Sequence, residues 1–283
     1  MRLQISGCRT KVGVLGLALA VTVTVTRAQD TSVDARGRNL DQVLDVYVRD
    51  GYVYYRALKQ DRRLLDAYVN GLAAVSIDAA PRDERLAFWL NAYNALVLRT
   101  VIDHVPIPPR SSDYPPGSIR QIPGAFERLT HRVAGRSVTL DQIEQTILPG
   151  FQDPRVYFAL GRGAVGGGRL RSEAFTAAGL QRQLSEVPGE CVSRAQCVAV
   201  DRTLNTVTIS SIFSWREKEF SAAYADRAAL VFRSRSPIER AALAFVEPGL
   251  LTTERDFLTK NEFRVQYAPF DWSLNDLTGR GGQ

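Results

Sequence analysis

Residues 86–98 read LAFWLNAYNALVL, and this stretch is apolar on almost every side when it is placed on a helix. Such a helix packs inside a core, because it has no polar face to turn toward water. Pro81 stands just before it, and acidic residues follow in the first turn, where the helix dipole favours them. Pro106 and two further prolines end the pattern. The sequence therefore predicts a central helix around which the rest of the fold is built.

The rest of the chain mixes helical and strand patterns without a regular βαβ rhythm. Amphipathic spacing predicts helices near 40–47 and 64–72, and capping patterns predict helix starts at Thr139 and Ser236. Further patterns predict a buried strand over 156–160, a helix over 172–184, a hairpin over 198–209 and a last strand over 263–267. We expect an α+β fold, with one globular domain over 40–276 in which the apolar helix packs with a small, mostly antiparallel sheet. Residues 29–39 are expected to be loose, and residues 277–283 to form a disordered tail.

The N-terminus has the order of a secretory signal peptide. Arg2, Arg9 and Lys11 precede an apolar run over 12–25, and Thr26-Arg27-Ala28 supplies small residues for cleavage. The apolar run is shorter than the roughly 20 residues that a membrane span needs, although an uncleaved anchor helix is the alternative. Residues 1–28 are thus expected to be removed, which predicts a periplasmic or extracellular protein without a stable membrane span.

Charge argues against a nucleic-acid partner. The full chain has a formal net charge of +6, and residues 1–28 hold four cations and no anions, so the mature chain is 6 − 4 = +2. A balance so close to neutral, with both signs interspersed, gives no electrostatic footprint for nucleic acid.

Two cysteines remain after processing, Cys191 and Cys197. Outside the cytoplasm a close, even pair predicts a disulfide, with free thiols as the alternative. No metal site and no cofactor are predicted, because His104 and His131 lie far from the cysteines in sequence.

A glycine-rich stretch, GRGAVGGGR at 161–169, follows the predicted strand and precedes the predicted helix. The spacing of Gly161, Gly163 and Gly166 matches a dinucleotide fingerprint, but export and the helical upstream chain argue against that interpretation. A tight turn is the plain alternative. A third is an anion cradle, in which Arg162, Arg169 and Arg171 add charge to exposed amides at a helix N-terminus.

Asn91 and Asn94 lie three residues apart on the central helix and so share a face. Buried amides need hydrogen-bond partners, which favours a structural clasp on a neighbouring loop over a role in a site. Asp141, Glu144 and Gln145 also share a face, for which a solvated helix surface is the simpler interpretation.

Several stretches together resemble the family called domain of unknown function 547. The resemblance runs over most of residues 40–276, and the matching stretches are DGYV at 50–53, LAFWLNAYNAL at 86–96, TLDQIEQTIL at 139–148, DPR at 153–155, FAL at 158–160, LRSEAF at 170–175, SSIFSW at 210–215 and YAPFDWSLND at 267–276. The family has no settled function to carry over. Its usual pattern includes cysteines and histidines, which imply nucleophilic catalysis.

This chain departs from that pattern at each of those positions. Tyr157 and Gln145 stand where the family has histidines, and Arg162 and Gly167 stand where it has cysteines. A guanidinium is not a thiolate nucleophile, and a glutamine does not shuttle protons. Thiol catalysis by these positions is therefore not expected.

Three functional hypotheses follow. The first is an exported protein that binds an anionic small molecule or polymer end at the glycine-arginine loop. The second, from another class, is a hydrolase or transferase with a rebuilt site, in which Glu144 or Glu173 is the base, Tyr157 a proton donor and Arg162 a clamp. The third is a structural envelope protein. The first two require Asn91, Asn94, Tyr157 and Arg162 to come together in the fold.

Overall fold

The structure, a computed structural model, describes residues 30–278. The expected signal peptide, residues 1–28, and most of the expected tail, residues 279–283, lie outside the described residues. The helices are α1 Asp30–Tyr47, α2 Tyr55–Gln60, α3 Arg63–Gly71, α4 Arg82–His104, α5 Leu140–Gln142, α6 Leu180–Val192, α7 Ser211–Trp215, α8 Glu217–Tyr224, α9 Pro237–Val246 and α10 Thr252–Thr259. The strands are β1 Val48–Arg49, β2 Tyr52–Val53, β3 His131–Val133, β4 Arg136–Val138, β5 Val198–Asp201, β6 Thr206–Ser210 and β7 Arg264–Ala268.

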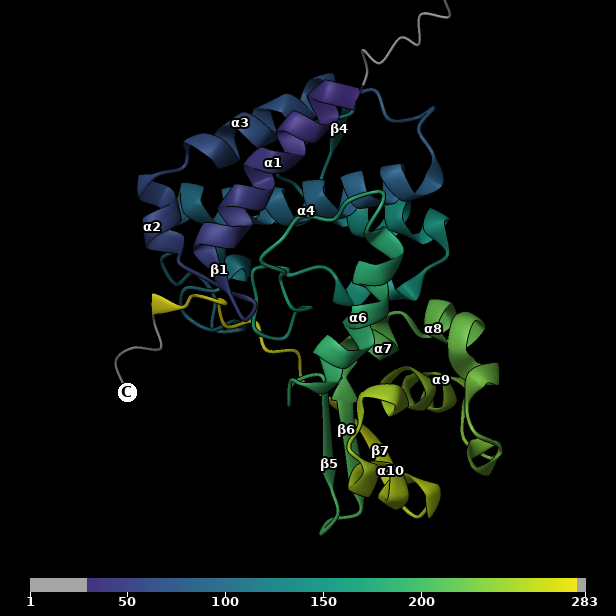
Figure 1. Cartoon of the computed structure of the whole chain (residues 1–283). Coiled ribbons are helices and arrows are strands. Elements are labelled where there is room, and N and C mark those ends of the chain that lie inside the picture. Colours follow the sequence, from purple (N-terminus) through teal and green to yellow (C-terminus); the bar gives the residue numbers. More distant parts are fainter. Residues whose placement is uncertain (1–29, 279–283) are drawn as a thin grey trace, which may run out of the picture.

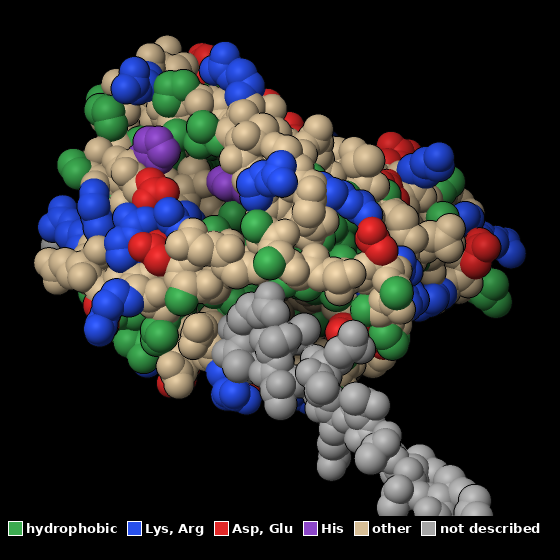
Figure 2. All heavy atoms as spheres, turned by 90° about the horizontal axis from the view of Figure 1, so that it is seen from above, with side chains coloured by type: hydrophobic (Ala, Val, Ile, Leu, Met, Phe, Trp, Pro, Cys, Tyr) green, Lys and Arg blue, Asp and Glu red, His purple; other side chains and the backbone are tan. Residues whose placement is uncertain are grey.

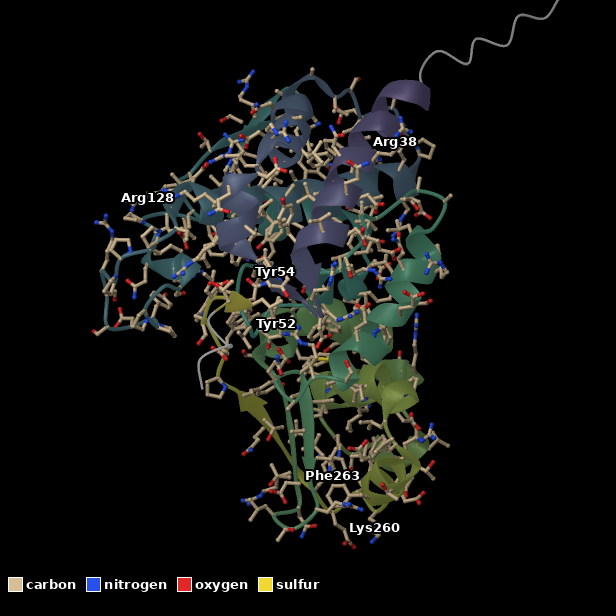
Figure 3. All side chains as sticks on the ribbon, turned by 60° about the vertical axis from the view of Figure 1, so that its left-hand side comes forward. Arg38, Tyr52, Tyr54, Arg128, Lys260 and Phe263 are labelled. Atoms are coloured by element: carbon tan, nitrogen blue, oxygen red, sulfur yellow. A yellow bond between two sulfur atoms is a disulfide. The ribbon has the colours of Figure 1, made fainter. Side chains whose placement is uncertain are left out.

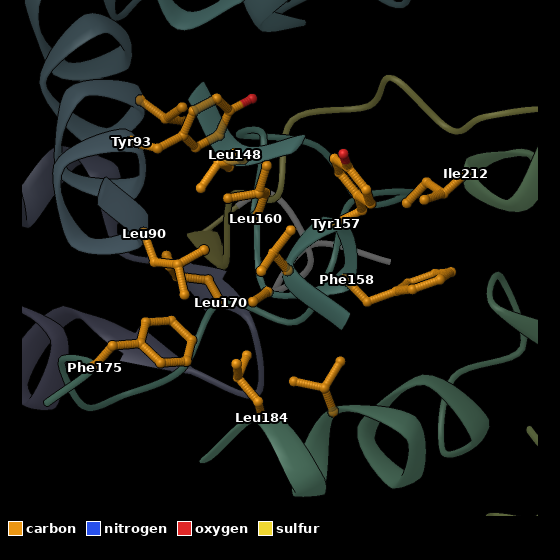
Figure 4. Packing of buried hydrophobic residues seen from close by; sticks show 14 of the residues in the cluster. Leu90, Tyr93, Leu148, Tyr157, Phe158, Leu160, Leu170, Phe175, Leu184 and Ile212 are labelled. Carbon is orange, nitrogen blue, oxygen red and sulfur yellow. The ribbon is translucent and has the colours of Figure 1, made fainter. Parts of the chain in front are cut away.

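The central helix is confirmed as α4, and every residue from Leu86 to Leu98 on it is buried. Helices α1 and α3 lie together with α4 at one end of the molecule, and β5, β6, β7 and α10 lie at the other (Figure 1). Leu90 and Tyr93 of α4 face Leu160 and Leu170 of the glycine-rich region (Figure 4). The apolar helix thus organises a core that continues into the glycine-rich region.

The strands form small sheets, and the α+β fold class is confirmed. β1 pairs with β2, and β3 with β4, as antiparallel hairpins. The predicted hairpin over 198–209 is β5–β6, with Val198 opposite Ile209. β7 adds to β6 in parallel, with Thr206 opposite Arg264, so this three-stranded sheet is mixed. Among residues 30–278, no helix combines the length and the apolar character that a bilayer crossing requires.

The chain after β7 runs back across the molecule to the β1–β2 hairpin. Val53 bridges Asp276, and Ala164 of the glycine-rich loop bridges Leu274. The buried Asn275 donates from Nδ2 to the carbonyl oxygen of Gly51 at 2.8 Å. Figure 3 shows Tyr52 and Tyr54 near this returning segment, whereas Lys260 and Phe263 lie close to the start of β7, at the far end. The segment therefore joins the two ends of the fold over the glycine-rich loop.

Two elements beside that loop differ from the sequence prediction. The predicted strand over 156–160 is wrong, because a 3-10 turn, Pro154–Phe158, occupies this place, opened by the Asp153 side chain that accepts from Arg155 N. A short buried apolar run does not by itself separate strand from helix.

The predicted helix over 172–184 is also wrong at its start, because α6 begins only at Leu180. Side chains from other elements hold the backbone of 174–176 in an irregular course: Asp41 accepts from Ala174 N, Asn91 from Phe175 N and Gln183 from Thr176 N. The glycine-rich loop therefore does not lead into a helix N-terminus, which was one premise of the anion cradle.

Two smaller differences concern the N-terminal part. α1 is already helical from Asp30, where the sequence predicts a loose segment over 29–39. The second difference is an additional short helix, α2, which begins at Tyr55 just after β2. The predicted helix starts at Thr139 and Ser236 are both confirmed, each with a complete capping box.

Candidate functional site

Asn91 and Asn94 hold the backbone on both sides of the glycine-rich loop. Asn91 donates from Nδ2 to Phe175 O at 2.7 Å, and its Oδ1 accepts from Phe175 N at 2.8 Å. Asn94 donates to Ala159 O at 3.1 Å and accepts from Gly161 N at 3.0 Å. Both side chains are buried. The predicted structural clasp is confirmed, because each amide saturates one stretch of backbone as a paired strand would.

The amides of the loop bond within the protein. Gly166 N donates to Asp271 O at 2.8 Å, Gly167 N to Ala164 O at 3.1 Å and Gly168 N to Leu160 O at 2.9 Å. A Cβ on Gly167 would overlap the carbonyl oxygen of Gly161, and one on Gly168 would overlap that of Phe158. These glycines thus allow backbone to pack on backbone, which is the tight-turn interpretation.

Arg162 turns into the core. Its φ is 52°, a left-handed conformation that costs a side-chain-bearing residue about 1–2 kcal/mol. The side chain is 2% exposed, and Nη1 donates to Tyr157 O at 2.9 Å. Nη2 donates to Glu144 Oε1 at 2.7 Å and Nε to Glu144 Oε2 at 3.2 Å. This bidentate pair with Glu144 is a structural ion pair, and it directs the Arg162 guanidinium away from an anion contact at the surface.

Glu144 is the centre of this cluster, and the expectation that it lies on a solvated helix face is wrong. It is 5% exposed and sits in a π-helical turn, Ile143–Ile147, a feature frequent at functional sites. Tyr93 donates from its hydroxyl to Oε2 at 3.0 Å, and Arg216 donates from Nη2 to Oε1 at 3.1 Å. The carboxylate therefore accepts from two arginines and one tyrosine, while its neighbour Gln145 is exposed.

Tyr157 completes the cluster on its outer side. The guanidinium of Arg216 lies over the Tyr157 ring, 4.3 Å from its centroid. The Tyr157 hydroxyl donates to Glu219 Oε1 at 3.2 Å, and Glu219 in turn lies 3.7 Å from Arg216 Nη1. Two arginines and two carboxylates thus balance their charges in a region that is largely closed to water.

These contacts set the protonation states. Burial acts to raise the pKa of Glu144, but the charges of Arg162 and Arg216 and their hydrogen bonds outweigh it, so the pKa lies below its ordinary value. Burial raises the pKa of Tyr157 well above its ordinary value, with Glu219 adding to the effect. Neither group is therefore poised to exchange a proton near neutral pH.

Arg171 and Glu173 belong to a second, more exposed cluster. Arg171 contacts three carboxylates, those of Glu173 at 2.7 Å, Glu186 at 2.6 Å and Glu190 at 2.7 Å. Arg169 pairs with Asp50 at 3.1 Å and Glu190 at 3.4 Å. A groove of about 460 Å³ opens beside them, lined by Asp41, Asp45, Arg169, Arg171, Ser172, Glu173 and Arg182.

The disulfide is confirmed, and it supports the glycine-rich loop. Cys191 and Cys197 are bonded, with their Cα atoms 5.3 Å apart, inside the 7 Å that such a bond allows. Arg194, between them in sequence, donates to Gly167 O at 2.9 Å and to Val165 O at 2.8 Å. The bond thus fixes the short segment whose arginine holds the carbonyl side of the loop.

The fold brings together some of the predicted site residues and separates others. Asn94, Tyr157 and Arg162 meet around residues 157–162, as expected, and Glu144 joins them. Arg169, Arg171 and Glu173 lie in the second cluster, and Asn91 contacts Phe175.

Sequence motifs did not single out Arg216, Tyr93 or Arg194 as members of a site. Tyr93 lies in the same helix stretch as the two asparagines and Arg194 lies between the two cysteines, which are the only local signals. The ligand-binding role of the predicted site residues stays a prediction.

Comparison with known protein families finds a match to part of the chain. Residues 77–189 match the family model described as "Protein of unknown function, DUF547". No curated protein and no solved structure matches the chain significantly. The matched segment begins before α4 and ends within α6, so it contains Glu144, Tyr157, Arg162 and the glycine-rich loop.

Proposed function

The chain belongs, over residues 77–189, to the domain of unknown function 547 family, and from that premise we propose that it is an exported, non-thiol binding protein for a small carboxylate-bearing ligand. The ligand site in this proposal is the groove beside the glycine-rich loop, which we call the Arg169 groove. It is lined by Asp41, Asp45, Arg169, Arg171, Ser172, Glu173 and Arg182.

The absence of thiol chemistry is supported by the place of Arg162. This residue stands at a family cysteine position, and its guanidinium is bound to Glu144 through two hydrogen bonds. The remaining cysteines of the mature chain, Cys191 and Cys197, are joined to each other. A buried ion pair therefore occupies the place where the family pattern has its reactive groups, and it acts there as a structural element.

The solvent exposure of the arginine side chains indicates where an anion could bind. Arg162 is 2% exposed and Arg171 has a side chain 10% exposed against three carboxylates. Arg169 and Arg182 keep 31% and 62% of their side-chain surface exposed. These two guanidinium groups are the ones in the Arg169 groove that can turn toward a ligand carboxylate.

The acids in the same groove narrow the ligand class. Asp41 and Asp45 lie one turn apart on α1 and are exposed. Glu173, which precedes α6 in an irregular segment, lines the same groove. A bare dianion would be repelled by these carboxylates, whereas a ligand that also carries an ammonium group would pair with them. A free amino acid carries a carboxylate and an ammonium group on the same residue and so has both charges. This mixed charge in one groove is the observation on which the proposal rests.

Export is supported by two separate features. The first is the charged, apolar and small-residue order of residues 1–28. The second is the buried disulfide between Cys191 and Cys197, since such bonds persist in oxidising compartments.

The rebuilt-enzyme hypothesis receives less support from the same contacts. The pKa of Glu144 is lowered by its arginines, and that of Tyr157 is raised by burial. Burial acts to raise the pKa of Glu173, but hydrogen bonds from Gln183 and Arg171 outweigh it and leave the pKa below its ordinary value. A general base needs a pKa near the working pH, which none of these groups approaches. A structural envelope protein is the remaining alternative if no ligand binds.

Calorimetric titration of the purified protein with the common amino acids and with inorganic phosphate tests the proposal. We expect at least one amino acid to bind better than phosphate. Arg169→Ala and Arg182→Ala should each weaken that binding roughly 10- to 100-fold, because a charge-assisted hydrogen bond contributes about 1.5–3 kcal/mol.

Arg63→Ala is the matched control, because Arg63 is an exposed arginine, 88% accessible, on α3. Equal affinity in all three variants would contradict the proposed groove. If neither the amino acids nor phosphate binds, the binding function itself is contradicted.

A further inference from the structure

We propose that a second surface of this protein binds a glycan by stacking sugar rings on aromatic side chains. The surface, which we call the aromatic face, is made by Trp215, Phe270, Trp272 and Tyr114. It draws on three segments far apart in sequence: the end of α7, the chain after β7 and the loop that follows α4. It is separate from the Arg169 groove and does not depend on the function proposed there.

Three rings of the aromatic face, those of Trp215, Phe270 and Trp272, lie close together. Trp215 and Phe270 have centroids 4.8 Å apart and planes inclined by 32°. Phe270 and Trp272 are 4.4 Å apart and inclined by 49°, and the two indoles of Trp215 and Trp272 are inclined by 21°. Trp215 is 47% exposed, and the other two rings are partly exposed. A packed group of aromatic rings thus meets solvent, where large aromatic side chains are usually covered.

Trp272 is also packed by Arg120 and Phe126. The guanidinium of Arg120 lies 4.6 Å from the Trp272 ring centroid and 4.5 Å from that of Phe126, and it is fixed by an ion pair with Glu127. Phe126 also packs edge-on against Trp272, with centroids 5.8 Å apart. Because these rings are already ordered, a ligand that stacks on them meets little entropic cost, which is a property of binding surfaces.

A polar groove continues from the rings. Tyr114 packs edge-on against Trp272 at 6.1 Å and also lines a groove of about 410 Å³, together with Pro109, Arg110, Ser111, Ser112 and Pro116. Two serines and an arginine there offer hydrogen-bond donors beside an aromatic ring. No ion pair of the Arg110 side chain is found within residues 30–278, and the residue is exposed, so its charge is free to meet an acidic substituent.

This combination fits a sugar better than a membrane or a proline-rich peptide. A pyranose ring has apolar C–H faces and a rim of hydroxyl groups, so it stacks on a flat ring while its rim is hydrogen-bonded. Asp271, exposed between Phe270 and Trp272, can accept from a hydroxyl but would be repelled by anionic lipid. A polyproline helix inserts prolines between separated aromatic ridges, whereas the rings of Trp215, Phe270 and Trp272 pack on one another.

Tryptophan fluorescence gives a direct test, because Trp89 is 4% exposed and the response would come from Trp215 and Trp272. The purified protein is titrated with oligomers of N-acetylglucosamine and of galacturonic acid. We expect a saturable change with at least one series. Trp215→Ala should weaken that binding, measured by calorimetry, at least tenfold, and Trp215→Phe should restore part of it. Arg110→Ala should weaken only binding of the acidic series.

Tyr54→Ala is the matched control, since Tyr54 is an aromatic residue 37% exposed and is not one of the four residues of the aromatic face. It should bind glycan as the wild type does, and amino-acid binding in the Arg169 groove should be unchanged in Trp215→Ala. The proposal is overturned if neither oligomer series binds, if Trp215→Ala binds as well as wild type, or if binding is seen only to phosphatidylglycerol vesicles or to a proline-rich peptide.

Discussion

Arg162 and Glu144 form a bidentate ion pair in the core, with Nη2 and Oε1 separated by 2.7 Å and with 2% and 7% of the two side chains exposed. Arg162 lies at a position where the family pattern has a cysteine, and Glu144 lies next to a position where it has a histidine. The pair is closed by Tyr93 and Arg216, which donate to the same carboxylate. The part of the fold expected to hold reactive groups therefore holds an ionic cluster whose central carboxylate is paired. Figure 2 shows side chains of both charge signs interspersed on the face seen from above.

Removing one member of the buried pair should destabilise the protein strongly. Arg162→Ala leaves Glu144 with an uncompensated charge, for which we expect a loss of about 3–5 kcal/mol in the free energy of unfolding. Urea unfolding followed by circular dichroism measures this loss. Arg63→Ala, which removes an exposed ion pair, should change stability by less than about 1 kcal/mol. Equal losses of unfolding free energy for the two substitutions would show that the buried pair stabilises the fold no more than the exposed pair does.

Acid should weaken the fold partly through Glu144. Its pKa in the folded chain lies below the ordinary 4.5, so its contribution is fully present above pH 4.5 and is lost as the pH falls through the lowered value. Unfolding free energies measured between pH 6 and pH 3 should therefore drop more steeply for wild type than for Glu144→Gln. Parallel curves for the two proteins would contradict this assignment.

Breaking the disulfide should loosen the glycine-rich loop as well as destabilise the fold. We expect Cys191→Ser with Cys197→Ser to cost on the order of 2 kcal/mol, since the closed loop is short. Because Arg194 holds the carbonyls of Val165 and Gly167, amide hydrogen exchange in residues 163–168 should become faster. Arg194→Ala, with the disulfide intact, should reproduce the faster exchange. If amide exchange in this loop is unchanged in both variants, the claim that Arg194 stabilises the loop is contradicted.

The glycines of the loop should be required for packing and not for a ligand. Gly168→Ala places a methyl group against the carbonyl oxygen of Phe158, so we expect little folded protein in the soluble fraction. Gly150→Ala is the control, because nothing lies within 4 Å of a Cβ built there. Normal yield and melting temperature for Gly168→Ala would contradict the observed course of the loop.

How far the sequence predicts this molecule differs between its parts. The central helix follows directly from LAFWLNAYNALVL, and the capping boxes at Thr139 and Ser236 mark their helix starts because their signals are local. The disulfide prediction rests on two nearby cysteines together with the expectation of export. The segment 156–179 could not be predicted, because the side chains that hold it come from distant residues such as Asp41, Asn91 and Asn94.

The candidate site shows the same division. Asn94, Tyr157 and Arg162 meet as the motifs suggest, but the burial of Glu144 depends on Arg216, which lies 72 residues further along the chain. Sequence spacing alone places Glu144 on an exposed helix face, and only tertiary contacts reverse that. The Arg169 groove could not be predicted from the sequence either, since Asp41 and Asp45 of α1 and Arg182 of α6 belong to no recognisable motif.

Thermal denaturation of wild type, Arg162→Ala and Arg182→Ala, with and without saturating amino acid, tests the account most directly. We predict that Arg162→Ala melts roughly 6–20 °C lower without ligand, since a loss of about 3–5 kcal/mol shifts the melting temperature by roughly 2–4 °C per kcal/mol in a domain of this size, and keeps the full ligand-induced rise. Arg182→Ala should melt as wild type does without ligand and lose most of the rise. If Arg162→Ala instead leaves the ligand-free melting temperature unchanged and abolishes the rise, Arg162 is a ligand contact and the structural role assigned to its pair with Glu144 is wrong.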